Sequence, residues 1–478
     1  MSLDVLVAAC EHLETLPADL ERVALEEGAA RFSLVQGLCR SQPALPSAPA
    51  DAAVAVVCRW PDDPDALRRA FREVEVSDPL VRIVVVSEAA PAPARAAVRG
   101  AVRRWRRSAL PRHTRPRWGT SPARRSRRAL LGLPPLAFDP LPTVDPELCE
   151  AAEGCRSCVE ACPRDALVVA GERVLLDAAQ CTSCGVCAAV CPTRATELGG
   201  YGPGDVEEEL RAGLAEAPGA AVAFACPRRH VREDWVQVLV PCASAVTAGM
   251  VAGALALGAS AVALAQCGDG CRSGSDELPR ARAEEIASSL AGWEREPRLV
   301  SFVRAGALPP DPPSGAPPAR ELPPGFATVS GLAWRALLPP EGDAVDSPHL
   351  GVGFASIDAG ACTSCGTCAR VCPTGAIELF QEGERTSLTY EHARCVACGL
   401  CVHNCPERAA GAITVTARLS PRELPSRRLV RESGVRRCRR CGGEVASEAV
   451  LARMREVLGA SFDEERMANL CPSCRGLG

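Results

Sequence analysis

The feature that most constrains this chain is a run of four cysteines that recurs at fixed spacing. Three segments read Cys-x2-Cys-x2-Cys-x3-Cys-Pro without deviation. Their cysteines are Cys181, Cys184, Cys187 and Cys191; Cys362, Cys365, Cys368 and Cys372; and Cys395, Cys398, Cys401 and Cys405. Disulfide frameworks are typical of short secreted chains, whereas this chain has 478 residues and no recognisable signal peptide. The spacing therefore predicts metal-bound thiolates.

These runs resemble those of bacterial ferredoxins with two 4Fe-4S clusters. Three thiolates from one tight loop suit three corners of a cubane, and we expect Gly185, Gly366 and Gly399 to supply the positive φ angle of that turn. The resemblance implies that the fourth cysteine crosses to the partner cluster. In the second block, the implied ligand sets are Cys362, Cys365, Cys368 and Cys405 for one cluster, and Cys395, Cys398, Cys401 and Cys372 for the other.

The first block begins with a run that departs from the pattern. It reads Cys149-x5-Cys155-x2-Cys158-x3-Cys162-Pro163, with three extra residues and with Arg156 where the other loops have glycine. If Cys149 is a ligand, the clusters of this block take Cys149, Cys155, Cys158 and Cys191, and Cys181, Cys184, Cys187 and Cys162. If Cys149 is not a ligand, its site holds a 3Fe-4S cluster or a labile iron. Zinc suits isolated Cys-x2-Cys pairs better than a triple followed by Cys-Pro.

Four more cysteines lie between the two blocks. They are Cys226, Cys242, Cys267 and Cys271. Three of them directly follow an apolar, strand-like segment. Because the carboxyl ends of parallel strands meet at one edge of a sheet, we expect the four thiols to converge there on a 2Fe-2S cluster, with tetrahedral zinc as the alternative. Small buried residues at strand ends are the third interpretation.

Two segments resemble known redox proteins. Residues 219–304, with the four central cysteines, resemble the delta subunit of methyl-viologen-reducing hydrogenase, which links hydrogenase to heterodisulfide reductase in methanogens. That resemblance implies an electron-relay module. The N-terminal segment resembles more weakly the opening domain of the heterodisulfide reductase large subunit, through Cys10, Cys39 and Cys58, which we interpret as structural thiols.

The C-terminal segment carries two further cysteine pairs. Cys438-x2-Cys441 and Cys471-x2-Cys474 are separated by 29 residues. This is the spacing of a closed tetrahedral site, so we predict a zinc-ribbon-like knuckle with a structural zinc. The Cys-Pro-x-Cys pair resembles rubredoxin, which leaves a single iron as the alternative.

The chain is predicted to be multidomain, of mixed α/β and α+β class. Residues 243–266 contain no charge, but they are mostly alanine and glycine, with Gly249 and Gly253 at helical spacing. We predict a buried helix followed by a buried strand here, and no membrane span. The predicted segments are an α/β domain (1–102), a basic linker (103–140), a dicluster ferredoxin domain (141–200), an α/β iron–sulfur domain (219–305), a Pro-rich linker (306–350), a second dicluster domain (351–417) and the knuckle (436–478).

Sequence motifs for other chemistry are absent. There is no phosphate loop, no complete Gly-x-Gly-x-x-Gly fingerprint and no arrangement typical of a nucleophile, so we predict no catalytic residue. We expect a cytoplasmic electron-transfer subunit between partner oxidoreductases, such as a hydrogenase or formate dehydrogenase and a heterodisulfide-reductase-like protein, without nucleic acid. The alternatives are an oxidoreductase that converts a thiol, disulfide or sulfur compound at the central cysteines, and a redox sensor or cluster scaffold.

Overall fold

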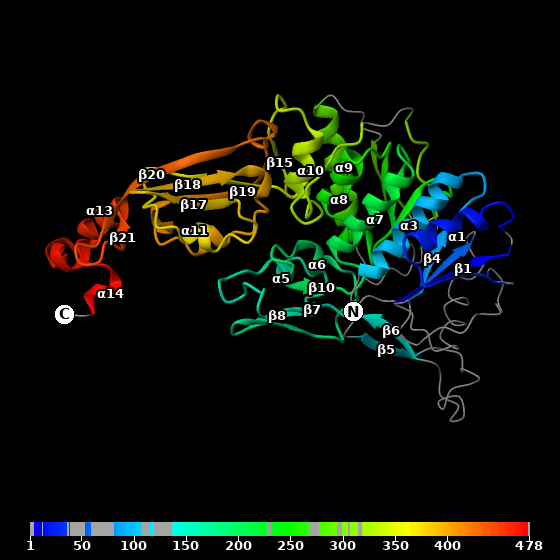
Figure 1. The fold of residues 1–478 in the computed structure, drawn as a ribbon, viewed down its shortest axis with the longest axis horizontal. Helices are drawn as coiled ribbons and strands as arrows, with labels where there is room; N and C mark the ends of the chain where they lie inside the picture. Colours follow the sequence, from blue (N-terminus) through cyan, green and yellow to red (C-terminus); the bar gives the residue numbers. More distant parts are fainter. Residues whose placement is uncertain are drawn as a thin grey trace. The chain divides into compact units, whose positions relative to one another are not determined.

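The computed structural model of the chain consists of two compact units. Met1–Cys149 and Arg156–Leu338 form the first unit, and Glu150–Cys155 and Pro339–Gly478 form the second (Figure 1). The structure describes residues 4–11, 13–35, 38, 53–58, 81–107, 114–118, 136–226, 229, 231–266, 277–293, 299–304, 306–313 and 318–476.

A four-stranded parallel sheet opens the first unit, with strand order β2-β1-β3-β4. The two central strands, β1 and β3, are apolar along their whole length and fully buried, as is typical of parallel strands covered on both faces. Cys10 and Cys58 end these neighbouring strands and are both buried. The elements are β1 (Val5–Cys10), α1 (Pro17–Glu26), β2 (Arg31–Val35), β3 (Ala53–Cys58), β4 (Val81–Val85) and α3 (Pro91–Arg107).

A second parallel sheet, with strand order β12-β11-β13-β14, forms the centre of the same unit. Its strands β11 and β13 are short apolar runs in which every residue is buried. The elements are α7 (Pro203–Glu216), β11 (Val222–Ala225), β12 (Val236–Leu239), the 3-10 helix η2 (Ala243–Ala245), α8 (Ala248–Ala256), β13 (Val262–Ala265), α9 (Glu277–Gly292), β14 (Val300–Val303) and α10 (Ser330–Leu337). The uncharged run is thus a buried helix, α8, followed by a buried strand, β13, as predicted.

Helix α8 shows why its glycines are needed. A Cβ at Gly253 would lie 2.1 Å from the Phe326 ring, and one at Gly249 would lie 2.1 Å from the Phe326 carbonyl oxygen. Phe326 and Trp334 are fully buried, and α10 packs against α8. The prediction of a Pro-rich linker over 306–350 is therefore wrong for this part, because its aromatic side chains complete the central core. Among the described residues, no helix is both long enough and apolar enough to cross a membrane.

The N-terminal and central sheets are joined by a buried ion-pair network. Glu209 of α7 accepts a hydrogen bond from Arg82 at 2.9 Å and pairs with Arg104 of α3. Burial disfavours the charged carboxylate, but the two arginines outweigh this effect and hold the pKa of Glu209 below its usual value. Since Arg104 is 1% exposed and α3 continues to Arg107, the predicted start of an exposed linker at residue 103 is wrong.

The first cysteine block contains one short hairpin and one two-residue strand pair formed by its two ends. Its cysteine loops lie between strand pairs of only two to four residues, and each loop leads into one turn of helix. The strands β5 and β6, which pair with each other, precede the block and lie inside the predicted basic linker. The elements are β5 (Thr114–Trp118), β6 (Leu136–Pro140), β7 (Thr143–Val144), α5 (Ser157–Glu160), β8 (Leu167–Ala170), β9 (Arg173–Leu176), α6 (Val186–Val190) and β10 (Thr196–Glu197).

The second block belongs to a larger antiparallel sheet. The strands β17 and β18 form a hairpin between its two cysteine runs, with Gly383 at φ 58° in the turn. Strand β20 then pairs with β18 and with β21, so one sheet, β17-β18-β20-β21, continues from the ferredoxin-like block into the tail (Figure 1). The predicted domain end at residue 417 is therefore too early, because β20 completes this sheet.

The remaining elements of the second unit surround that sheet. A three-stranded antiparallel sheet has the order β15-β19-β16. The elements are β15 (Val345–Asp346), β16 (Gly353–Ile357), α11 (Thr367–Arg370), β17 (Ile377–Glu382), β18 (Arg385–Glu391), α12 (Leu400–His403), β19 (Ile413–Leu419), β20 (Arg427–Arg437), β21 (Glu444–Ser447), α13 (Glu448–Leu458), a π-helical turn (Glu464–Ala468) and α14 (Pro472–Arg475).

Candidate metal sites

The regular cysteine runs form turns with two left-handed residues. Gly185, Gly366 and Gly399 have φ angles of 80°, 76° and 77°, as predicted. The residue before the second cysteine is also left-handed, and these residues are Ser183, Ser364 and Ala397, with φ angles of 58°, 54° and 56°. Nothing in their residue types indicates this conformation, which L-residues adopt only at some energetic cost, so sequence reasoning missed it.

These turns direct backbone N–H groups at sulfur. The Ser183 N–H donates to Cys181 Sγ at 3.4 Å, and the Ser364 N–H donates to Cys362 Sγ at the same distance. The fourth cysteines receive similar bonds, from Ala166 N–H to Cys162 Sγ at 3.3 Å, for example. Such donors stabilise negative charge on a sulfur ligand.

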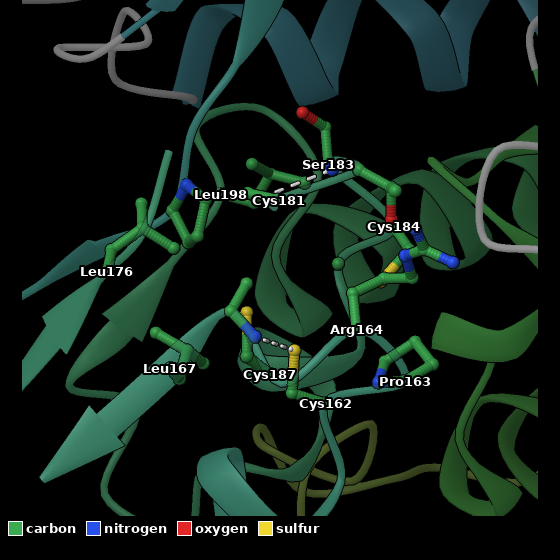
Figure 2. Close-up of a pocket in the computed structure, with 14 residues that line it drawn as sticks. Cys162, Pro163, Arg164, Leu167, Leu176, Cys181, Ser183, Cys184, Cys187 and Leu198 are labelled. Atoms are coloured by element: carbon green, nitrogen blue, oxygen red, sulfur yellow. Dashed lines mark hydrogen bonds between the residues drawn. The ribbon is translucent and has the colours of Figure 1, made fainter. Parts of the chain in front are cut away.

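Three of the four proposed ligand sets each line one pocket. In the first block, Cys181, Cys184 and Cys187 line a pocket together with Cys162 from the other run, beside Leu167 and Leu176 (Figure 2). In the second block, the pockets are lined by Cys362, Cys365, Cys368 and Cys405, and by Cys395, Cys398, Cys401 and Cys372. The fourth cysteine of one run therefore lies with the first three of the other run.

Burial makes some of the thiols in these pockets unusually basic. Burial, reinforced by neighbouring thiolates, raises the pKa of Cys368 and of Cys398 to about 12. Thiols with such raised pKa values hold their protons near neutral pH unless a bound cationic centre displaces them. Four converging sulfurs in an otherwise apolar pocket, with N–H donors aimed at sulfur, are a donor set that fits a 4Fe-4S cluster.

The irregular run has a different turn. Gly154, before Cys155, is left-handed at φ 91°, but Arg156 has φ −130° where the regular runs have a left-handed glycine. Cys155 falls in the second unit, whereas Cys149, Cys158 and Cys191 fall in the first. Ligation of a cluster by Cys149, Cys155, Cys158 and Cys191 therefore stays a prediction.

Comparison with known proteins identifies the two blocks. The 4Fe-4S dicluster domain family matches residues 145–195 and 361–409. An uncharacterised ferredoxin of Methanocaldococcus jannaschii is 42% identical over 57 residues, which are 12% of this chain and 90% of that protein. The chain belongs to the dicluster ferredoxins. A ferredoxin of Methanothermococcus thermolithotrophicus is 41% identical over 54 residues, 11% of this chain and 88% of that protein.

The prediction of an iron–sulfur electron-transfer protein with two dicluster ferredoxin domains is thus confirmed. The matched residues fall within the predicted segments 141–200 and 351–417. The likenesses to the hydrogenase delta subunit and to heterodisulfide reductase concern residues outside these matches, and they stay predictions.

The structure describes two of the four central cysteines of this ferredoxin, Cys226 and Cys242. Cys226 directly follows β11, Cys242 follows its parallel neighbour β12, and both are buried at the same edge of the sheet. Cys267 and Cys271 lie outside the described residues. The loop that carries Cys242 contacts the cluster loop of the first block, because a Cβ at Gly185 would lie 2.6 Å from Pro241 Cγ.

The tail brings its four cysteines together. The sulfur atoms of Cys438, Cys441, Cys471 and Cys474 all lie within 4.8 Å of one another. The backbone N–H groups of Cys471 and Cys441 lower the pKa of Cys438 to about 6, which favours a thiolate ligand near neutral pH. This geometry fits one tetrahedral ion, while zinc as its identity stays a prediction.

Proposed function

We propose that this ferredoxin relays electrons through four 4Fe-4S clusters between two partner oxidoreductases. The observation that carries the proposal is the crossing of the runs, since three pockets each combine three cysteines of one run with the fourth cysteine of the other. Bound clusters supply reversible one-electron transfer with little ligand movement. The ligands proposed for the fourth cluster are Cys149, Cys155, Cys158 and Cys191.

Thiols, backbone N–H groups and apolar side chains of the chain prepare each pocket for a cluster whose charge changes on reduction. The thiols lose their protons when they ligate iron, and the N–H donors of the turns stabilise the negative sulfurs. In the first domain, apolar side chains such as Leu167 and Leu176 line the pocket and limit access by water. Hydrogen bonds, charge and exposure then set the reduction potential of each site.

We infer that the central cysteines extend the relay as a 2Fe-2S centre, with Cys226, Cys242, Cys267 and Cys271 as ligands. The contact between Pro241 and the turn at Gly185 supports this, because it sets the Cys242 loop against a cluster loop. The resemblance to the hydrogenase delta subunit suggests the partners: a hydrogenase or formate dehydrogenase on one side and a heterodisulfide-reductase-like protein on the other. A reducing cytoplasm is the compartment that suits so many thiols.

Metal analysis of anaerobically purified protein tests the cluster count. We expect about sixteen irons in 4Fe-4S form and about two more in the central site. An iron content near eight contradicts four clusters. The paired variant Cys226→Ser/Cys242→Ser should remove the central iron alone, so that the four cubanes still accept electrons from dithionite while transfer to the partner stops.

The matched control is Cys10→Ser, which changes a buried cysteine at the end of a parallel strand in the other sheet. It should leave both iron content and transfer unchanged. If the paired central variant transfers electrons at the wild-type rate, the central cysteines are structural and the relay ends at the ferredoxin domains.

A further inference from the structure

Tyr390 is a buried polar side chain beside a ligand of the second ferredoxin domain. It lies at the end of β18, five residues before Cys395, and is 0% exposed. Its hydroxyl oxygen accepts a hydrogen bond from the Ala355 N–H at 3.0 Å, and the hydroxyl donates to the Gly353 carbonyl oxygen at 3.1 Å. A buried hydroxyl with this many backbone neighbours is held in one orientation.

His392 fixes the direction of that hydroxyl. The Ser420 N–H donates to His392 Nε2 at 3.0 Å, so Nε2 carries no proton and the ring hydrogen lies on Nδ1. Nδ1 is 3.3 Å from the Tyr390 oxygen and donates to it. With donors from Ala355 and His392, both acceptor positions of the Tyr390 oxygen are filled, and its own hydrogen must point to an acceptor.

The Gly353 carbonyl accepts this hydrogen in the structure. Cys395 Sγ is a second acceptor close by, because a Cβ on Gly353 would lie 2.7 Å from that sulfur, and Cys395 contributes, after burial, to the raised pKa of Tyr390. A ligated, negatively charged sulfur is a stronger acceptor than a neutral carbonyl.

We propose that, when the cluster is bound, the Tyr390 hydroxyl donates to Cys395 Sγ instead of the Gly353 carbonyl and raises the reduction potential of the cluster that takes Cys372, Cys395, Cys398 and Cys401. This inference rests on the proposed function, because it requires a cluster in that pocket. Reduction adds negative charge to the sulfur ligands, and a fixed hydrogen-bond donor stabilises the reduced form more than the oxidised form.

The first domain has no such hydroxyl donor at the corresponding sequence position. Leu176, five residues before Cys181, takes the sequence position of Tyr390, and Ala178 takes that of His392. The first domain therefore has no hydroxyl and no imidazole at these two positions. This difference favours electrons at the Tyr390 site over the Leu176 site.

Redox titration of the full chain with Tyr390→Phe, followed by electron paramagnetic resonance, tests the proposal. We expect one cluster to shift to a lower potential by about 59 mV, a tenfold change in the ratio of reduced to oxidised form, and the other clusters to stay unchanged. The control Phe354→Leu alters the ring packed against Tyr390 at 6.4 Å but keeps the hydroxyl, so it should leave the potential in place. No shift in Tyr390→Phe, or an equal shift in Phe354→Leu, overturns the proposal.

A second experiment keeps the buried shape nearly intact. The chain has two tyrosines, so 3-fluorotyrosine in a Tyr201→Phe background labels Tyr390 alone. Its more acidic hydroxyl is a stronger donor and should raise the same potential, in the opposite direction to Tyr390→Phe; an unchanged potential contradicts the proposal. A wild-type iron content near eight instead contradicts the proposed function, which is a separate result.

Discussion

The two ferredoxin domains have similar ligand spacing but different support. The first contains only short strand pairs, and its Gly185 turn packs against Pro241 of the central α/β region. The second belongs to an antiparallel sheet that β20 extends into the metal-binding tail. The cysteine spacing therefore determines which sulfurs line a pocket. The packing behind each loop determines how strongly that loop is held and which polar groups reach the sulfurs.

Replacing a cysteine that ligates the cluster of the other run should have the largest effect, which is a loss of iron. It should also distinguish the second domain, whose two runs are regular, from the first domain, whose first run is irregular. Cys405→Ser should remove about four irons, those held with Cys362, Cys365 and Cys368, because Cys405 lies in their pocket. Cys191→Ser should instead destabilise the cluster at the irregular run. Iron analysis and Mössbauer spectroscopy measure both. Loss of the Cys395 cluster alone in Cys405→Ser would disprove the crossed ligation.

The buried ion pair of the first unit gives the next largest effect. Glu209→Ala leaves two buried guanidinium groups without their carboxylate, so we expect the first unit to lose about 3–5 kcal/mol of unfolding free energy, while the second unit keeps its melting temperature. The control Glu216→Ala removes partly exposed pairs to Arg95 and Arg99 and should cost about 1 kcal/mol or less. If calorimetry showed both units melting earlier in Glu209→Ala, the loss would not be confined to the first unit and the prediction would be wrong.

The same carboxylate predicts how the first unit responds to acid. Because the pKa of Glu209 is lowered in the folded state, the stabilisation is fully present above the usual pKa of a glutamate and is lost as the pH falls through the lowered value. Wild type should therefore lose stability in this acidic range more steeply than Glu209→Gln. Equal slopes for the two proteins would show that the ion pair contributes nothing.

Two glycines at equivalent positions, one in each domain, allow the packing behind two cluster loops to be compared. Gly185→Ala and Gly399→Ala both place a Cβ at positive φ, at about 1–2 kcal/mol. A Cβ at Gly399 meets nothing within 4 Å, whereas one at Gly185 meets Pro241 at 2.6 Å, which adds about 1–3 kcal/mol of overpacking. Denaturation of the two variants measures the difference. Equal losses would mean that the Pro241 contact yields without strain.

The two dicluster ferredoxin blocks and the buried helix and strand of residues 243–266 could be predicted from the sequence, because both are local patterns. The cysteine spacing indicates the blocks, and the uncharged run indicates α8 and β13. Strand β20 was missed, since its sequence is rich in arginine and its pairing with β18 is a long-range interaction. Phe326 was missed for a similar reason: its proline-rich surroundings indicate a linker, and only the tertiary fold sets it against the glycines of α8.

The last expected effect concerns the link between the tail and the second domain. Ser447 begins α13, where its hydroxyl accepts a hydrogen bond from the Val450 N–H at 3.2 Å. The same hydroxyl donates to the carbonyl oxygen of Thr363, a pocket residue between two cluster ligands, at 2.9 Å, and this bond is buried. One side chain therefore caps a tail helix and holds a cluster loop.

Ser447→Ala removes both interactions, so we expect the second unit to lose about 1 kcal/mol for the helix cap and about 1 kcal/mol for the buried bond. Ser447→Thr keeps a hydroxyl and should lose clearly less. The cluster at Cys362, Cys365, Cys368 and Cys405 should also bleach faster in air in Ser447→Ala, while the clusters of the first domain keep their wild-type rate. If all clusters bleach at the wild-type rate, the tail folds beside the second domain without supporting its cluster loop.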